Sequence, residues 1–173
     1  MNLKNVEVIS ELIENQGIFE SRGYSDLKVS KIIDGKPEIK NVRLPIKSTG
    51  VAEYQEKLKS KTPAPPTTKI LVKKNSPEGK DLGLPYDRMV QTYDLTDERY
   101  VDDLEKFNQD MNWRIAIFAL DVILKKTDGS LAETYEEKKR VLQSSNITGH
   151  HILKILKDVH ELTSWAEDRQ DFL

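Results

Sequence analysis

The sequence contains no cysteine, so a disulfide framework and a thiolate metal site are both excluded. It also lacks a long apolar run: the longest, residues 115–120, is followed at once by Asp121. A membrane-spanning helix needs about 20 such residues. The residues after Met1 lack the apolar core of a secretory signal peptide. We therefore expect a protein of the bacterial or host cell cytoplasm that has no membrane partner.

The chain also lacks a large excess of either sign of charge. Its net charge is only −2, which gives no general attraction to nucleic acid. The 173 residues fit one domain, or one domain with a small appendage. Residues 1–80 hold 15 basic and 10 acidic side chains, a net charge of +5, whereas residues 81–173 hold 12 and 19, a net charge of −7. Two solvated faces explain such a division, and charge-guided contact between halves or copies is the alternative.

The first half of the chain changes its apolar period. Apolar residues at helical spacing predict a helix over residues 3–14. Alternation then predicts two strands joined by a tight turn at Asp34-Gly35, a dipeptide typical of hairpins. The apolar pattern shifts by one position between Ile39 and Val42, which predicts a bulge in the second strand.

The middle of the chain predicts short elements around a proline-rich connector. Residues 62–67 contain three prolines and cannot form a helix. They suit a stiff spacer, with a docking ligand for an aromatic groove as the alternative. The neighbouring patterns predict a helix over 50–60, a strand over 70–72, a helical turn over 78–82 and another short helix over 86–93.

A long amphipathic helix is predicted from its N-cap at Thr96 to Lys125, with acidic residues in its first turn. Its apolar seam repeats every seven residues through Val101, Leu104, Asn108, Met111, Ile115, Phe118 and Val122. Asn108 is the one polar member of this seam. It sets the register or the choice of partner, or else it is partly exposed.

Two further helices follow, so the fold class is α+β. Capping-box patterns begin at Ser130 and at Thr134, and Thr148 is the expected cap of the last helix, whose apolar face runs from Ile152 to Leu162. The N-terminal helix and antiparallel β-hairpin, with a short extra strand, precede a mostly helical C-terminal half in a three-helix arrangement. We divide the chain into residues 1–75 and 76–173, or treat it as one compact domain.

The familiar templates for chemistry do not fit. His151 and His160 lie on opposite sides of one helix, so they cannot share a metal. The stretch 78–81 lacks the upstream glycine and the Ser/Thr of a phosphate-binding loop, and a calcium loop starting at Asp94 would have Arg99 in place of glycine. We therefore predict no catalytic residues, no metal site and no cofactor.

The arrangement of the chain resembles that of phage and prophage tail assembly chaperones. The resemblance rests on the lysine-rich hairpin 27–46, the connector 61–66, the helix 108–120 and the turn 147–151. It implies a protein without catalytic residues that binds the long, aggregation-prone tape-measure protein and presents it for tail-tube assembly.

We therefore predict a non-enzymatic protein-interaction or assembly factor that binds another protein or a second copy of itself. The candidate contact residues are Val101, Leu104, Asn108, Met111 and Trp113. One alternative is an enzyme or small-molecule binder whose scattered site contains His150, His151, Trp113 and Arg114. The other is a nucleic-acid-binding module that uses the basic N-terminal half.

Overall fold

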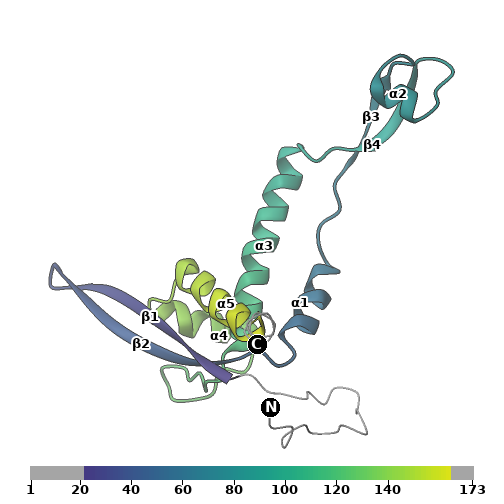
Figure 1. The fold of residues 1–173 in the computed structure, drawn as a ribbon. Helices are drawn as coiled ribbons and strands as arrows, with labels where there is room; N and C mark the ends of the chain where they lie inside the picture. Colours follow the sequence, from purple (N-terminus) through teal and green to yellow (C-terminus); the bar gives the residue numbers. More distant parts are fainter. Residues whose placement is uncertain (1–21, 165–173) are drawn as a thin grey trace, which may run out of the picture.

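The computed structural model describes residues 22–164, so the helix predicted over residues 3–14 lies outside the described part. The predicted α+β fold class is confirmed, with two separate antiparallel two-stranded sheets. The elements, in chain order, are β1 (Arg22–Ile33), β2 (Lys36–Lys47), α1 (Val51–Lys59), β3 (Thr67–Val72), α2 (Pro77–Asp81), β4 (Arg88–Tyr93), α3 (Glu98–Ala119), α4 (Tyr135–Ser144) and α5 (Gly149–Ser164) (Figure 1).

The predicted hairpin of β1 and β2 is confirmed, but the predicted bulge is wrong. Asp34 and Gly35 both adopt positive φ angles, 49° and 75°, as a two-residue type I′ turn requires. The register then continues without interruption from Ile33↔Lys36 to Arg22↔Lys47. Ile39 does not need to turn toward the core, because it lies on the projecting end of the hairpin and is 67% exposed.

The body of the molecule consists of the β1–β2 hairpin, α1, the C-terminal half of α3, α4 and α5. α5 packs across α3 and β1, and its predicted apolar face is confirmed, since Ile152, Ile155 and Val159 are all buried. Tyr54 of α1 stacks on Phe118 of α3 with 4.5 Å between the ring centroids. The buried core residues are Leu27, Ile46, Val51, Leu58, Ile115, Ala116, Ala119, Leu120, Leu142, Ile147, Ile152, Ile155 and Val159.

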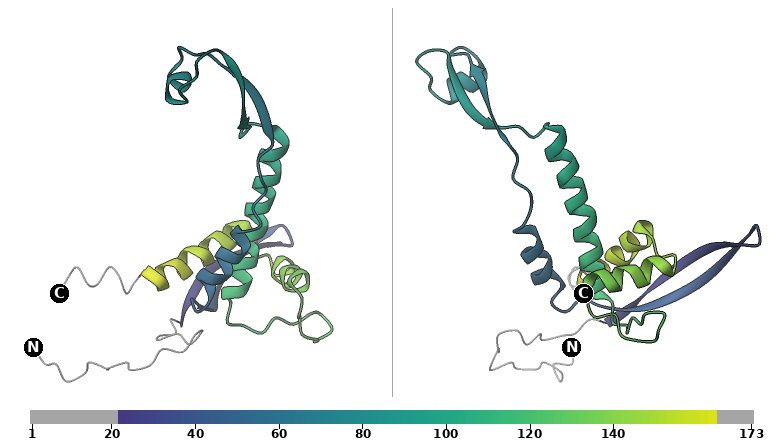
Figure 2. Two further views of the ribbon diagram at one scale, coloured as in Figure 1. Left: turned by 90° about the vertical axis from the view of Figure 1, so that its right-hand side faces the viewer. Right: turned by 180° about the vertical axis from the view of Figure 1, so that it is seen from behind.

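The long helix α3 begins one residue later than expected. Its N-cap is Asp97, whose carboxylate accepts a hydrogen bond from the N–H of Tyr100. Thr96 instead donates its N–H and its hydroxyl to the carboxylate of Asp94. The helix has 22 residues and is therefore about 33 Å long. Its N-terminal half extends away from the body (Figures 1 and 2).

The predicted C-terminal end of this helix is also wrong, because α3 stops at Ala119 and not at Lys125. Leu120 adopts an extended conformation and bridges Ile46, and the N–H of Asp121 donates to the carbonyl of Pro45. Pairing with the edge of β2 thus replaces the last helical turns. Beyond this point Ile123 is 74% exposed, although the helical pattern had placed its neighbours in a buried stripe.

The helix predicted over residues 86–93 is a strand, β4, which pairs with β3 from Thr67↔Tyr93 to Val72↔Arg88. The short helix α2 lies between the two strands, and residues 62–66 form the predicted non-helical connector from α1. The predicted division after residue 75 falls between β3 and α2, within this unit, and it remains a prediction.

The last two helices start where local capping signals place them. The Thr134 hydroxyl accepts from the N–H of Glu137, and the Glu137 carboxylate accepts from the N–H of Thr134, which completes the predicted capping box. α5 begins directly after Thr148. Across residues 22–164, none of the helices has the length and apolar character needed to cross a membrane.

Candidate functional site

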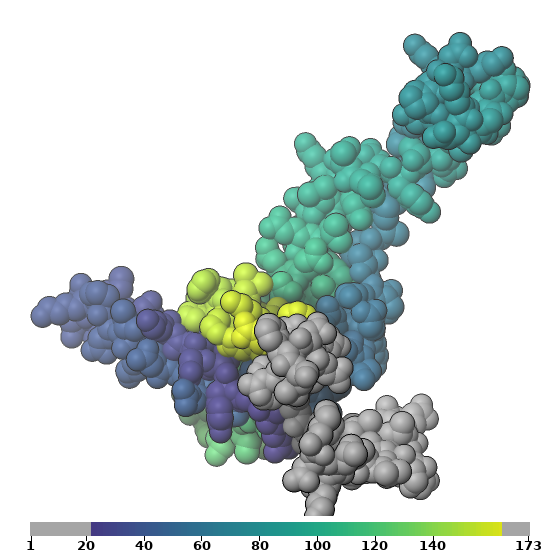
Figure 3. Space-filling model, in the orientation of Figure 1, coloured from purple at the N-terminus to yellow at the C-terminus, as the bar shows by residue number. Residues whose placement is uncertain are grey.

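The unit formed by β3, α2 and β4, which we call the arm (residues 67–95), projects from the body. All three ribbon views place it at the far end of α3 from α4 and α5 (Figures 1 and 2), and it forms a separate lobe in the space-filling view (Figure 3). The arm therefore offers surfaces that the body does not cover.

One side of the arm is packed by its own short helix. Val72 is only 6% exposed, and Val90 on the neighbouring strand is half-buried. The Ser76 hydroxyl caps α2 by accepting from the N–H of Gly79. Gly79 is buried so closely against β3 that a Cβ atom there would lie 2.0 Å from the carbonyl oxygen of Lys73. Only glycine allows this approach of α2 to the end of β3.

The other side of the arm's sheet, which we call the outer face, exposes three large apolar side chains around the polar pair Lys69↔Gln91. Leu71 and Met89 are cross-strand partners that are 58% and 54% exposed, and Tyr93, four residues along β4 on the same face, is 65% exposed. A two-stranded sheet on its own is marginally stable in water. An apolar face on such a sheet is typical of a surface that a partner covers.

The five predicted contact residues divide into two groups. Val101 is 46% exposed, Leu104 is half-buried and Asn108 is exposed, and all three lie on the half of α3 that adjoins the arm. Met111 and Trp113 instead pack against the core of the body. Asn108 is thus not part of a buried seam, which favours the reading of a partly exposed residue.

The free half of α3 is acidic. Between residues 97 and 106 it carries Asp97, Glu98, Asp102, Asp103 and Glu105 against two basic residues, Arg99 and Lys106. The acidic residues at its start are favoured by the helix dipole. This half-helix adds negative charge and the exposed apolar residue Val101 to the part of the molecule that adjoins the arm.

Asp110 is the centre of a polar cluster that joins α3 to α4. Its carboxylate accepts hydrogen bonds of 2.5 Å from the Tyr135 hydroxyl and 2.6 Å from Arg114 Nε, and the Arg114 guanidinium stacks 3.9 Å from the centroid of the Tyr135 ring. Burial acts to raise the pKa of Asp110, but the hydrogen bonds from Tyr135 and Arg114 outweigh it and hold the pKa below its ordinary value. Burial, followed by the bond to Asp110, raises the pKa of Tyr135.

His151 has a structural role at the start of α5. Its Nδ1 accepts from the N–H of Thr148 at 3.0 Å, and its Nε2 lies 2.9 Å from the carbonyl oxygen of Lys28 on β1. The backbone donor at Nδ1 fixes the tautomer that carries its proton on Nε2, so the ring donates to Lys28. The predicted cap, Thr148, immediately precedes α5, and in the structure its N–H donates to the His151 ring.

The four residues of the enzyme alternative contact different elements of the fold. Arg114 contacts Tyr135, and Trp113 lies 5.6 Å below the Lys139 ammonium, so both are engaged with α4. His151 contacts β1, and the His150 ring packs edge-on against the His151 ring. Among residues 22–164, no group of three or more His, Asp or Glu side chains could hold a metal ion.

Sequence reasoning missed the outer face because it assigned residues 86–93 to a helix. The β-branched and aromatic residues Val90, Thr92 and Tyr93 were the available signal for a strand. No model of a known protein family matches the chain, and comparisons with curated proteins and with solved structures find no match. The functional argument therefore rests on the geometry of the arm and α3.

Proposed function

We propose that this chain is a non-enzymatic assembly factor that binds another protein through the outer face of its arm and the free half of α3. The observation that carries the proposal is the exposed cross-strand pair Leu71–Met89 on a two-stranded sheet that stands apart from the body. A partner that covers this face supplies the apolar contact that a sheet of two strands lacks.

The energetic argument favours an apolar partner segment. Burying a Leu or Met side chain stabilises a complex by about 1.5–3 kcal/mol relative to leaving it exposed. Leu71, Met89 and Tyr93 lie on one face, so a single segment can cover all three. Val101 and Leu104 offer further apolar contacts on α3, where the surrounding carboxylates favour basic side chains in the partner.

The resemblance to tail assembly chaperones agrees with this proposal. In that family the partner is the tape-measure protein, whose exposed apolar segments must be kept from aggregating until the tail tube forms. We extend the proposal to a tape-measure or tail-tube protein as the partner of this chain, with self-association through the same face as the alternative.

Affinity capture from an extract of the native cell tests the proposal with matched variants. The double variant Leu71→Ser, Met89→Ser removes the apolar pair, and Ile123→Ser removes a body residue of greater exposure, 74%. We expect the natural chain and the Ile123→Ser variant to retain the same stoichiometric partner, and the double variant to lose it.

Two outcomes would contradict the proposal. One is capture of the same proteins by all three chains. The other is the absence of any captured protein together with a strictly monomeric chain at high concentration. A cross-link between copies that maps to the arm would identify the partner as a second copy. Circular dichroism of each variant confirms that the body remains folded.

A further inference from the structure

The β1–β2 hairpin has a second exposed feature, the outer edge of β2, which is separate from the arm. In a two-residue hairpin the closing pair, here Ile33↔Lys36, is joined by two backbone hydrogen bonds between its own residues. Every second pair along the ladder is joined in the same way. The pairs between them, such as Ser30↔Ile39 and Lys28↔Asn41, direct their N–H and C=O groups outward. Each edge of the hairpin therefore offers backbone groups at alternate residues.

Two outward carbonyl groups of β1 are already used by the body. Nε2 of His151 lies 2.9 Å from the carbonyl of Lys28, and Asn146 Nδ2 donates at 3.1 Å to the carbonyl of Ser30. These two side chains occupy the middle of the edge of β1, at Lys28 and Ser30. They also agree with the alternation of inward and outward pairs, because the carbonyls of Lys28 and Ser30 both belong to pairs that point outward.

Among the described residues, the outer edge of β2 meets a hydrogen-bond partner at one end. The N–H of Asp121 donates at 2.9 Å to the outward carbonyl of Pro45. Within residues 22–164, no hydrogen bond reaches the outward N–H groups of Ile39, Asn41 and Arg43. Pro37 and Pro45 stand at outward positions on either side, where a missing N–H costs no ladder bond. The open edge thus extends from Pro37 to Pro45.

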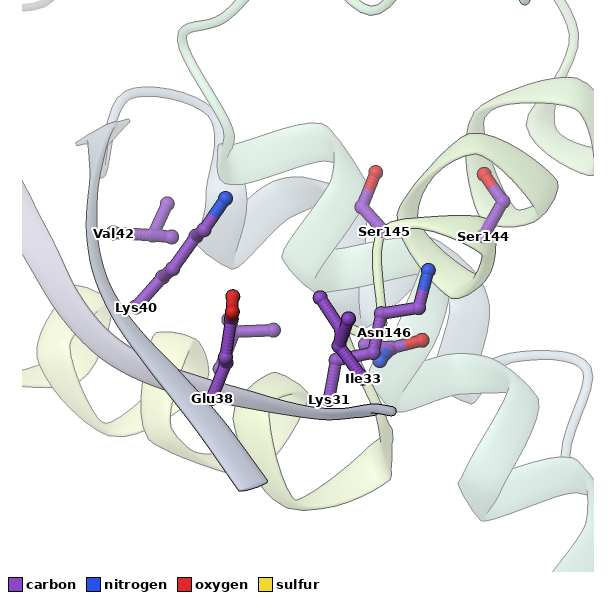
Figure 4. Close-up of a pocket in the computed structure, with 9 residues that line it drawn as sticks. Lys31, Ile33, Glu38, Lys40, Val42, Ser144, Ser145 and Asn146 are labelled. Atoms are coloured by element: carbon purple, nitrogen blue, oxygen red, sulfur yellow. The ribbon is translucent and has the colours of Figure 1, made fainter. Parts of the chain in front are cut away.

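A pocket adjoins this edge on the inner face of the hairpin. Its volume is about 250 Å³, and Figure 4 shows side chains of the hairpin facing the end of α4 across it. Its lining combines apolar side chains, two lysines and one glutamate of the hairpin with the polar residues 144–146: Val29, Lys31, Ile33, Glu38, Lys40, Val42, Ser144, Ser145 and Asn146. A strand added beside β2 would place every second side chain on the face that carries Glu38, Lys40 and Val42.

The net positive charge of the hairpin favours an acidic segment as the binding partner of the β2 edge. Residues 22–47 carry seven basic and three acidic side chains, a net charge of +4. A second copy of β2 would bring two hairpins of this net positive charge side by side, and neighbouring like charges destabilise a sheet. We infer that the edge of β2 from Pro37 to Pro45 binds an extended, acidic and apolar segment of a partner protein as an added third strand. The inference does not depend on the function proposed for the arm.

In this mode the backbone of Ile39, Asn41 and Arg43 supplies the hydrogen bonds, and the pocket and the lysines supply the preference for side chains. The probe is a capped heptapeptide of alternating glutamate and valine, added to the full-length chain labelled with ¹⁵N. We expect the peptide to slow amide exchange at Ile39, Asn41 and Arg43 by about tenfold or more. Binding should weaken with added salt, because the carboxylates face a basic hairpin.

A proline substitution separates edge binding from binding elsewhere. Asn41→Pro removes one outward N–H and leaves the β1–β2 ladder bonds in place, and Asn41→Thr keeps the N–H as the matched control. The expected result is loss of peptide binding, by about tenfold or more, for Asn41→Pro only. Should Asn41→Pro not fold, a peptide with N-methyl groups at alternate residues provides the same test on the natural chain, and it should not bind.

Three results would overturn the inference. The first is unchanged exchange at the three amides when the peptide is in large excess. The second is equal binding of a lysine–valine peptide, which would remove the charge argument. The third is protection of the same amides that rises with protein concentration alone, which would assign the edge to a second copy.

Discussion

The hydroxyl of Ser25 on β1 donates a hydrogen bond of 2.6 Å to Oδ2 of Asp158 on α5. Ser25 is completely buried and Asp158 is 9% exposed, while Lys154 bonds the other carboxylate oxygen from the same helix. This contact joins the sheet to the helix that covers it. The Asp158 carboxylate thus lies buried between β1 and α5, where each of its hydrogen bonds matters.

Replacing Ser25 by alanine should therefore destabilise the body. The substitution leaves one oxygen of a buried carboxylate without its partner, which costs about 1–3 kcal/mol. Urea unfolding followed by circular dichroism measures the change. Ser144→Ala is the control, because that hydroxyl is exposed and bonds only the Val141 carbonyl of its own helix. Equal midpoints for both variants would mean that the buried contact contributes nothing.

Asp110→Asn should lower the stability near neutral pH by about 1 kcal/mol, since the carboxylate is 40% exposed and solvent weakens its bonds. The folded-state pKa of Asp110 lies below its ordinary value, so its contribution is present above the unfolded-state pKa and is lost as the pH falls through the folded-state pKa. Urea midpoints of the two chains should therefore converge at low pH. Asp102→Asn, an exposed site on the same helix, should show no such convergence; a difference that stays constant with pH would contradict the assignment.

Gly79→Ala should destabilise the arm without unfolding the body. The added methyl group meets the Lys73 carbonyl at 2.0 Å, so the backbone must shift, at a cost of about 1–3 kcal/mol. Amide exchange measured by NMR should accelerate in β3 and β4 and stay unchanged in α5. Gly149→Ala is the matched control, because nothing lies within 4 Å of a Cβ atom at that position. Acceleration throughout the chain would show that the arm and the body unfold as one unit.

His151→Ala should loosen the start of α5 and the edge of β1 together. The variant loses the acceptor for the Thr148 N–H and the donor to the Lys28 carbonyl, which together are worth about 1–2 kcal/mol. Local amide exchange at Thr148 reports the change. His150→Ala, which removes the neighbouring ring, should leave this amide protected. Protection that persists in His151→Ala would rule out the capping role.

The sequence predicted the elements that local signals specify. The Asp34-Gly35 dipeptide adopts the two positive φ angles that a hairpin turn needs, and Thr134 with Glu137 forms a capping box from residues three positions apart. Both signals lie within four consecutive residues. Neither depends on a partner from elsewhere in the fold.

The errors arose where a distant segment decides the local structure. The helical pattern continues through Val122, but pairing of Leu120 with Ile46 ends the helix. Residues 88–93 form a strand because they pair with β3, which lies earlier in the chain on the other side of α2. The same error hid the outer face. Val101, Leu104 and Asn108 were therefore predicted as contact residues without Leu71, Met89 and Tyr93 of the arm.

Photo-cross-linking from the outer face tests the central claim most directly. A photo-reactive residue in place of Met89, expressed in the native cell, reports which protein lies against the arm. A residue of the same kind in place of Ile123 is the control on an exposed part of the body. We predict one predominant adduct from position 89 and none of that species from position 123. No adduct at position 89, or the same set of adducts at both positions, would contradict the account.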